Sequence, residues 1–315
     1  MSEVSIYIVI LVSTVILLNS NVSFGSKDII GAKEKNILVI EHLTKYATKQ
    51  KNYRREPKNF QSFGYLVFGK VVGEDAFFEY TFPLVDSHES LFRIKLNASN
   101  VSSTVNQFGC KTTCFARSGE SEYAVQTNDL AFLHSNMNKD GFYFYGFEKR
   151  GYGINHNHII DISKELTSRI AAFIVDELTK KQKDNYENRV RSALHFVQFL
   201  PYGVPDFDHA DDCYFELALP HESFVLSYSD CDSKSTLFAG ILHHLIEPEN
   251  IILVGCVIDG GGHMIAGVAG LYYPGQYYTF QDKKYLLIET TTPIPLELQP
   301  SNRFQEIEIH PVIQR

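Results

Sequence analysis

The sequence predicts an α+β protein, in which a strand-rich segment comes first, helices follow, and a second group of strands completes the chain. Three observations predict this order. Aromatic and β-branched residues, divided by clusters of Gly, Asp, Asn and Ser, dominate from Phe60 to about His158. Apolar residues then recur at helical spacing as far as Ile246. After Pro248 the spacing is again strand-like, and separate blocks of helices and strands are typical of α+β folds.

The composition is that of an ordinary globular protein. The chain has 315 residues, of which 44% are apolar and 21% are charged, and these values exclude a disordered or collagen-like chain. The length predicts about two domains. The formal net charge of −8 argues against binding to nucleic acid or to anionic lipid, because both require clustered Lys and Arg.

Residues 1–25 are typical of a secretory signal peptide or an N-terminal anchor. Their apolar run, residues 6–18, has 13 residues, whereas a membrane span needs roughly 20. The small residues Ser23 and Gly25 predict cleavage before Ser26. Because no Lys or Arg precedes the run, an uncleaved anchor is the alternative. Both interpretations predict an exported protein (secreted, periplasmic or at the cell surface), with this run as its only expected membrane contact.

The rest of the chain divides into four predicted segments. Residues 26–57 are Lys-rich and irregular, which predicts a linker. Residues 58–160 predict an antiparallel β domain, because short strand-like runs alternate with turn-forming residues. Residues 161–184 predict a connecting helix, and residues 185–315 predict a domain of helices followed by an antiparallel sheet.

Local patterns set the elements of the C-terminal half. Pro201 ends the second predicted helix, and the turn at residues 281–284 joins the last two predicted strands. The predicted helices are 162–178, 186–200 and 231–246. The predicted strands are 251–258, 263–270, 277–280 and 285–290.

Of the five cysteines, Cys231 has the surroundings that best suit chemistry. It follows Asp230, a good helix N-cap residue, which places the thiol in the first turn of a helix. There the helix dipole and the unpaired backbone N–H groups favour a thiolate and can stabilise an oxyanion. Asp232 and Lys234 are expected to be surface or capping residues. The other cysteines fit a small disulfide loop (Cys110 and Cys114) or ordinary buried thiols (Cys213 and Cys256).

A thiolate nucleophile requires an imidazole base, and the base requires an acidic group that orients it. His263 follows three glycines and opens an apolar strand, and glycine-rich backbone allows close approach to another element. Glu289 ends another apolar strand, where a carboxylate needs a partner. Asp282 is the alternative acid, but a hairpin turn explains it. The sequence therefore predicts Cys231, His263 and Glu289 as catalytic residues.

No cofactor and no metal are predicted. Two histidine pairs stand at close spacing, His156 with His158 and His243 with His244, and the first is expected on a strand, where both rings would share a face. No third ligand is evident beside either pair in the sequence, so the pattern does not indicate a metal site.

The sequence resembles the transglutaminase-like cysteine peptidase family over about residues 185–296. The motifs that carry the resemblance are FVQFLPYG, PHES, DCDSKS with the helix after it, GGHMIAGVAG and YLLIETTTP. The resemblance implies a papain-like core, in which Cys231 begins the central helix and His263 lies on the adjacent strand. Glu289 stands on the next strand, where many relatives have Asp. Many relatives complete the oxyanion hole with an aromatic or amide side chain. This chain has no Trp, so the donor is Tyr228, another side chain or the backbone.

These features predict an exported thiol enzyme that attacks an amide of a protein or peptide through Cys231 and forms an acyl-enzyme. Hydrolysis, as in a cysteine peptidase or amidase, is the favoured outcome, because the tyrosines at 272–278 are expected to pack rather than to exclude water. The alternatives are transfer to an amine, as in a cross-linking protein-glutamine amine transferase, and a non-catalytic binding or scaffold protein.

Overall fold

The computed structural model describes residues 58–62, 65, 67–72, 75–85, 89–97, 142–144, 152–204, 217–226 and 228–312. The predicted signal peptide or anchor, the predicted linker, the Cys110–Cys114 pair and Cys213 lie outside the described residues.

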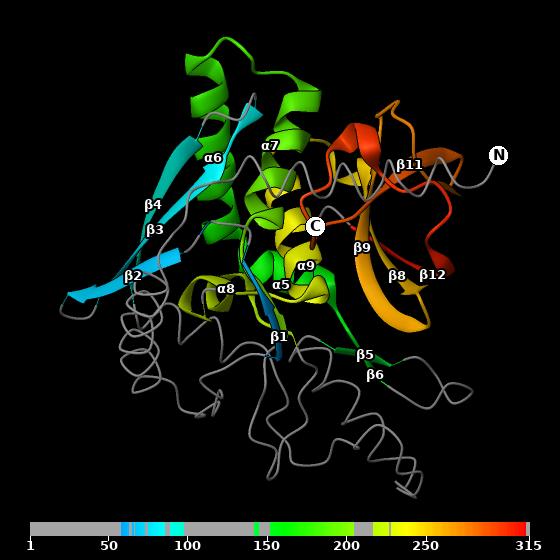
Figure 1. Cartoon of the computed structure of the whole chain (residues 1–315), viewed down its shortest axis with the longest axis horizontal. Helices are drawn as coiled ribbons and strands as arrows, with labels where there is room; N and C mark the ends of the chain where they lie inside the picture. Colours follow the sequence, from blue (N-terminus) through cyan, green and yellow to red (C-terminus); the bar gives the residue numbers. More distant parts are fainter. Residues whose placement is uncertain are drawn as a thin grey trace, which may run out of the picture.

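The described part of the chain is a mixed structure of helices and antiparallel sheets, which confirms the predicted α+β class. A three-stranded sheet has the order β2 (Val67–Val72), β3 (Asp75–Pro83) and β4 (Glu89–Asn97). A five-stranded sheet has the order β10-β11-β9-β8-β12. Helices lie between the two sheets in Figure 1, where α6 and α7 contact the cyan strands and α9 contacts the orange ones.

Three helices are close to the predicted ones, and two short helices were not predicted, one at residues 156–162 and one at residues 220–226, where a loop was expected. The first predicted helix, 162–178, is α6 (Lys164–Lys180), and a short helix that was not predicted, α5 (His156–Ile162), precedes it across Ser163. The residues before it, including His156 and His158, lie on a helix, so the predicted strand at this histidine pair is wrong. Asn155 explains the difference, because its side chain accepts a hydrogen bond from the His158 N–H and caps the first turn. The helices are α5 (His156–Ile162), α6 (Lys164–Lys180), α7 (Tyr186–Gln198), α8 (Pro220–Leu226) and α9 (Cys231–Leu242).

The four predicted C-terminal strands are confirmed as β8 (Ile251–Ile258), β9 (Gly261–Ala269), β10 (Tyr277–Phe280) and β11 (Lys283–Ile288). β10 and β11 are joined by a two-residue turn in which Gln281 and Asp282 both have positive φ, as a tight hairpin requires. Five further strands complete the described part: β1 (Lys58–Gln61), paired with β7 (Tyr202–Val204), β5 (Phe142–Phe144), paired with β6 (Tyr152–Ile154), and β12 (Gln305–Pro311). β1, β5 and β6 lie within the predicted β domain, whereas β7, β12 and two short 3₁₀ helices, η2 (Pro248–Asn250) and η3 (Leu296–Leu298), were not predicted.

One hydrophobic core joins the three-stranded sheet to the helices. Phe196 of α7 contacts Phe82 of β3 edge-on at a ring distance of 4.9 Å and Phe92 of β4 at 5.5 Å. The Tyr80 hydroxyl donates a hydrogen bond to the Phe196 carbonyl at 2.9 Å. Apolar residues from both sides of the predicted 160/161 boundary therefore share one buried cluster.

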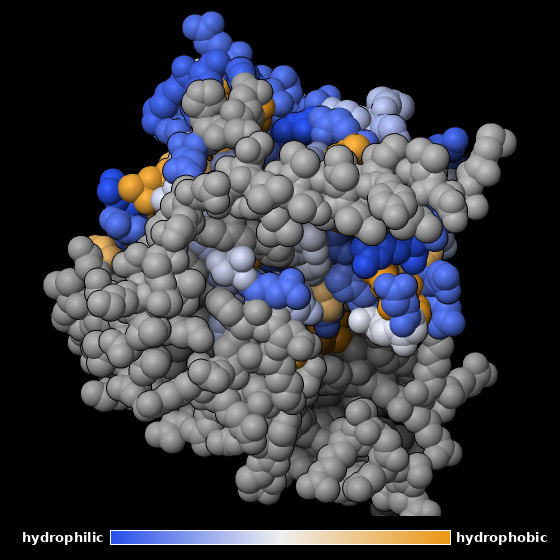
Figure 2. All heavy atoms as spheres, viewed as in Figure 1, coloured by the Kyte–Doolittle hydropathy of each residue, from blue (hydrophilic) through white to orange (hydrophobic). Residues whose placement is uncertain are grey.

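The outer end of the α6–α7 pair is hydrophilic, in contrast to this core. Lys180, Gln182 and Asp184 are exposed there, and Figure 2 shows hydrophilic side chains over this end of the molecule. Within the described ranges, no helix has the length and apolar character that crossing a bilayer would require.

Close packing of the five-stranded sheet depends on Gly267 in β9. A Cβ atom at this position would lie 2.6 Å from Ile252 Cγ1 and 3.2 Å from Tyr285 Cβ. We therefore expect Gly267→Ala to lower the free energy of unfolding by about 1–3 kcal/mol, as overpacking does. Urea unfolding measures the change, and Gly262→Ala in the same strand is the matched control, because a Cβ there meets nothing within 4 Å. Equal midpoints for the two variants would contradict this packing.

Candidate active site

Cys231 lies at the start of α9, as the sequence predicts. The Asp230 side chain accepts a hydrogen bond from the Ser233 N–H at 3.0 Å and caps the helix. The Cys231 side chain is partly exposed, whereas most of the helix behind it is buried. The thiol therefore stands where the first turn of a buried helix reaches the surface, next to backbone N–H groups that have no partner within the helix.

The polar residues at 233–236 are buried, and other segments hydrogen-bond to them. The Ser233 hydroxyl accepts a hydrogen bond from the Ala218 N–H at 2.8 Å, and Ser235 donates to the Met264 carbonyl at 3.0 Å. Lys234 is 0% exposed, so the expectation that it is a surface or capping residue is wrong. The polar start of α9 is therefore packed against the segments of Ala218 and Met264 rather than exposed to solvent.

The surroundings of Cys231 disfavour the loss of its thiol proton. Its Sγ donates a hydrogen bond to Asp232 Oδ1 at 3.4 Å. Burial raises the pKa of the Cys231 thiol well above its ordinary value, and the carboxylates of Asp232 and Asp230 act in the same direction. A hydrogen bond from the Met264 backbone lowers this pKa but does not outweigh them. Burial and the two carboxylates thus oppose the thiolate that the helix start favours, and a base that removes the thiol proton would assist nucleophilic attack.

His263 and Glu289 form a direct, largely buried pair. His263 Nε2 lies 3.0 Å from Glu289 Oε2 and 3.2 Å from Oε1, and the two side chains are 15% and 3% exposed. The two residues meet because β9 and β11 are hydrogen-bonded neighbours. Since Nε2 faces the carboxylate, Nδ1 is the ring nitrogen suited to accept a proton from a nucleophile.

The carboxylate of Glu289 is fixed from both ends. Glu289 Oε1 accepts hydrogen bonds from the Thr291 N–H at 2.8 Å and the Thr291 hydroxyl at 2.6 Å. Gln198 donates to its backbone carbonyl, and Gln299 accepts from its N–H, each at 2.8 Å. Burial alone would raise the pKa of Glu289, but the hydrogen bonds from His263 and Thr291 hold it below the ordinary value. Glu289 is thus an ionised, oriented acid at neutral pH.

The thiol and the imidazole come from adjoining segments. The Met264 backbone, which hydrogen-bonds to the Cys231 sulfur, belongs to the residue directly after His263. Within the described residues, the structure shows no hydrogen bond between Cys231 and His263 themselves. Contacts between nucleophile and base are often long without substrate and shorten when it binds.

Two alternatives to the predicted residues are less suited to the chemistry. Cys256 of β8 lies across the strands from His263, but it is 5% exposed, and burial raises the pKa of its thiol to about 11. It also lacks a helix start beside it. Asp282 lies in the exposed hairpin turn, as predicted, which leaves Glu289 as the acid that contacts the imidazole.

Tyr202 is a site residue that the sequence analysis did not select. It lies in β7, pairs with Ser229 in a parallel bridge, and is thereby held beside the start of α9. Burial and then the neighbouring Cys231 raise the pKa of Tyr202 to about 12, which keeps its hydroxyl protonated. The FVQFLPYG motif contains this residue. Tyr228, one of the donors considered from the sequence, is buried with 6% exposure.

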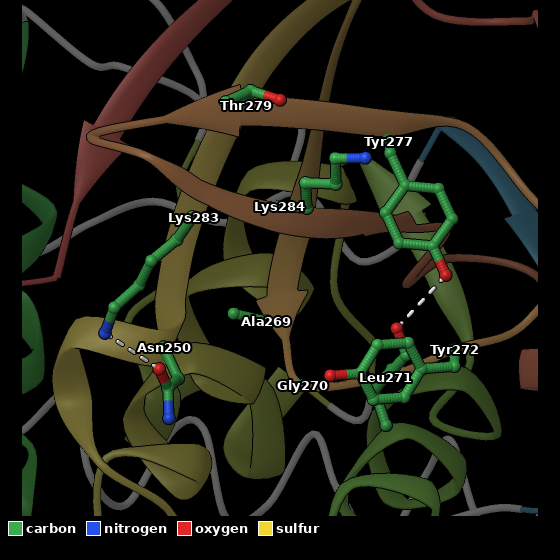
Figure 3. A pocket seen from close by; sticks show the side chains of 9 residues that line it. All are labelled: Asn250, Ala269, Gly270, Leu271, Tyr272, Tyr277, Thr279, Lys283 and Lys284. Carbon is green, nitrogen blue, oxygen red and sulfur yellow. Dashed lines mark hydrogen bonds between the residues drawn. The ribbon is translucent and has the colours of Figure 1, made fainter.

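A hollow among the described residues lies away from Cys231, His263 and Glu289. It has a volume of about 790 Å³ and is lined by residues at the opposite end of β9 from His263, among them Ala269, Tyr272 and Lys283 (Figure 3). Lys283 is held there by the Asn250 side chain at 3.1 Å. No group of three or more His, Cys, Asp or Glu suited to a metal occurs within the described ranges.

Comparison of the chain with protein-family models, curated proteins and solved structures finds no match. The contacts of Cys231, His263, Glu289 and Tyr202 bring together a thiol, an imidazole, a carboxylate and a hydroxyl, which are side-chain types that acyl transfer uses.

Proposed function

We propose that this protein is a thiol enzyme with a papain-like, transglutaminase-like core, which cleaves an amide bond of a protein or peptide through Cys231. The observation that carries the proposal is the buried Glu289–His263 pair, whose strand adjoins the helix start that presents the thiol. An ionised carboxylate on Nε2 fixes the tautomer that leaves Nδ1 free to act as a base.

The reaction follows from these positions. His263 Nδ1 takes the thiol proton as the Cys231 sulfur attacks the amide carbonyl carbon, and Glu289 stabilises the imidazolium that forms. The carbonyl oxygen becomes an oxyanion near the first-turn N–H groups of α9 and the Tyr202 hydroxyl. The imidazolium then protonates the amine as the C–N bond breaks, which leaves a thioester on Cys231. Water, deprotonated by His263, attacks the thioester and restores the thiol.

Hydrolysis is the outcome that the tyrosine positions support. A transferase must keep water from the acyl-enzyme until an amine arrives. The tyrosines after β9 have other roles: Tyr272 is 94% exposed, and the Tyr277 hydroxyl donates to the carbonyls of Leu271 and Tyr273. They lie around the hollow of Figure 3 rather than beside Cys231.

The test incubates the protein with a glutamine-containing peptide and a labelled primary amine at millimolar concentration, and quantifies both products. We expect free acid or cleaved peptide to exceed the amine adduct. An excess of adduct would show an amine transferase instead. The absence of both products across a peptide library, in a folded protein with an intact Cys231 thiol, would support the non-catalytic scaffold.

Tyr202 offers a test of the oxyanion site. Tyr202→Phe removes only the hydroxyl, so we expect kcat to fall about 10²-fold with little change in KM, because the donor acts on charge that develops in the transition state. Tyr272→Phe, in the distant hairpin, is the matched control. A rise in KM at constant kcat would assign Tyr202 to substrate binding rather than to the oxyanion.

Export of the protein stays a prediction, since residues 1–25 lie outside the described ranges. N-terminal sequencing of the protein from its host distinguishes the two exported forms. A start near Ser26 indicates a cleaved signal peptide, and an intact, membrane-bound chain indicates the anchor.

A further inference from the structure

Lys234 is a fully buried lysine one helical turn after the proposed nucleophile. Its exposure is 0%, although lysine is rarely buried without partners. Its Nζ donates hydrogen bonds to the carbonyls of Gln198 at 3.2 Å, Leu200 at 2.5 Å and Thr291 at 3.3 Å. Three acceptors match the three N–H donors of an ammonium, whereas a neutral amine has only two.

The three carbonyls belong to the segments that carry the other proposed site residues. Gln198 is the last residue of α7, Leu200 follows it by two residues, and the chain reaches Tyr202 two residues after Leu200. Thr291 follows Glu289 by two residues and donates both its N–H and its hydroxyl to that carboxylate. A single ammonium thus ties the helix of Cys231 to the strand of Tyr202 and to the turn that orients Glu289.

Lys234 is also the cation within a cluster of acidic groups. The carboxylates of Glu289 and Asp230 act on it directly and raise its pKa, but burial outweighs them and lowers the pKa of Lys234 to about 7. The other titratable groups around the site are Cys231 and Asp232 on α9, His263 on β9, Cys256 on β8, Tyr202 on β7 and His310 on β12. His310 belongs to this set because the carboxylate of Asp232 is close enough to act on the pKa of its imidazole.

We propose that Lys234 is a positioning residue of the site, which holds the Tyr202 and Glu289 segments against α9 and balances the buried carboxylates of Asp230 and Glu289. This inference rests on the proposed function. A nearby positive charge disfavours the protonated form of an acid or a base. Removal of the Lys234 ammonium is therefore expected to raise the pKa of each titrating group around it. A lysine that only filled space would leave those pKa values in place.

The experiment measures the rate of Cys231 alkylation by iodoacetamide from pH 5 to pH 9, with peptide mapping. In Lys234→Met we expect the acid limb of the profile to move to higher pH, so that the rate at pH 6 falls about tenfold, equivalent to one pH unit. The matched control is Lys164→Met. It makes the same chemical change at an exposed lysine of α6, whose Nζ bonds to Asp161 at 3.4 Å, away from the site. Its acid limb is expected to coincide with that of the parent.

The same substitution is also made in an Asp230→Asn background, which keeps a helix cap and removes one negative charge. Asp230→Asn alone should move the profile to lower pH, and adding Lys234→Met should move it back to higher pH. This pair of variants replaces the first comparison if Lys234→Met alone does not fold. Coincident profiles with and without Lys234 overturn the inference. A parent whose Cys231 does not react at any tested pH overturns the proposed function instead, so the two failures are distinguishable.

Discussion

Replacing Cys231 with Ala is expected to abolish amide cleavage while the fold stays intact. The thiol has one hydrogen bond from its sulfur, to Asp232, and a partly exposed position at a helix start, so its loss leaves no large cavity. Without the sulfur there is no covalent route, and removal of a triad nucleophile lowers kcat by about 10⁴-fold or more. Turnover of a cleaved peptide, measured beside the far-UV circular dichroism of both proteins, checks this expectation.

Cys256→Ala is the control for that variant, because Cys256 is the other cysteine among the described residues and lies opposite His263 in the sheet. Its thiol is buried, so the substitution is expected to lower stability slightly and to keep turnover near that of the parent. Loss of turnover in Cys256→Ala together with retention in Cys231→Ala would assign the nucleophile to β8.

Glu289→Gln is expected to lower turnover by about 10² to 10⁴-fold with little change in KM. The amide keeps the size of the side chain but cannot stabilise an imidazolium, and its NH₂ group can face Nε2 and favour the wrong tautomer of His263. The loss of one charge-assisted pair also removes the negative partner that holds the imidazole in place.

Asp282→Asn is the matched control, since it makes the same chemical change in the exposed β10–β11 turn. Its turnover is expected to equal that of the parent. If Asp282→Asn lowers kcat and Glu289→Gln does not, the orienting acid is misassigned.

The sequence predicted those parts of the site that depend on local pattern. The Asp230 cap and the apolar period that follows it specify a helix start at Cys231, and the alternating runs specify β9 and β11. The strand order then brings His263 and Glu289 together. Because each of these features is encoded within a few residues, it can be recognised without the rest of the fold.

Features that depend on distant segments could not be predicted in this way. Lys234 has the sequence pattern of a surface lysine. Its buried Nζ is satisfied by carbonyls of distant segments, among them Gln198 of α7 and Thr291 in the turn after Glu289, which the local sequence does not reveal. Tyr202 reaches the site through a bridge to Ser229, in a strand of three residues. β12 is rich in polar residues and becomes a strand because β8 offers it an edge.

Cys231 and His263 are proposed to act as a nucleophile and its base, and one measurement tests these roles without knowledge of the substrate. The parent and His263→Ala are treated briefly with iodoacetamide at pH 7.5, and the modified cysteines are identified and timed by peptide mapping. We expect Cys231 to be labelled in the parent and its labelling to slow about tenfold or more in His263→Ala, because the raised pKa of the thiol makes the base necessary. Equal labelling of Cys231 in both proteins, or labelling of Cys256 in its place, would contradict the account.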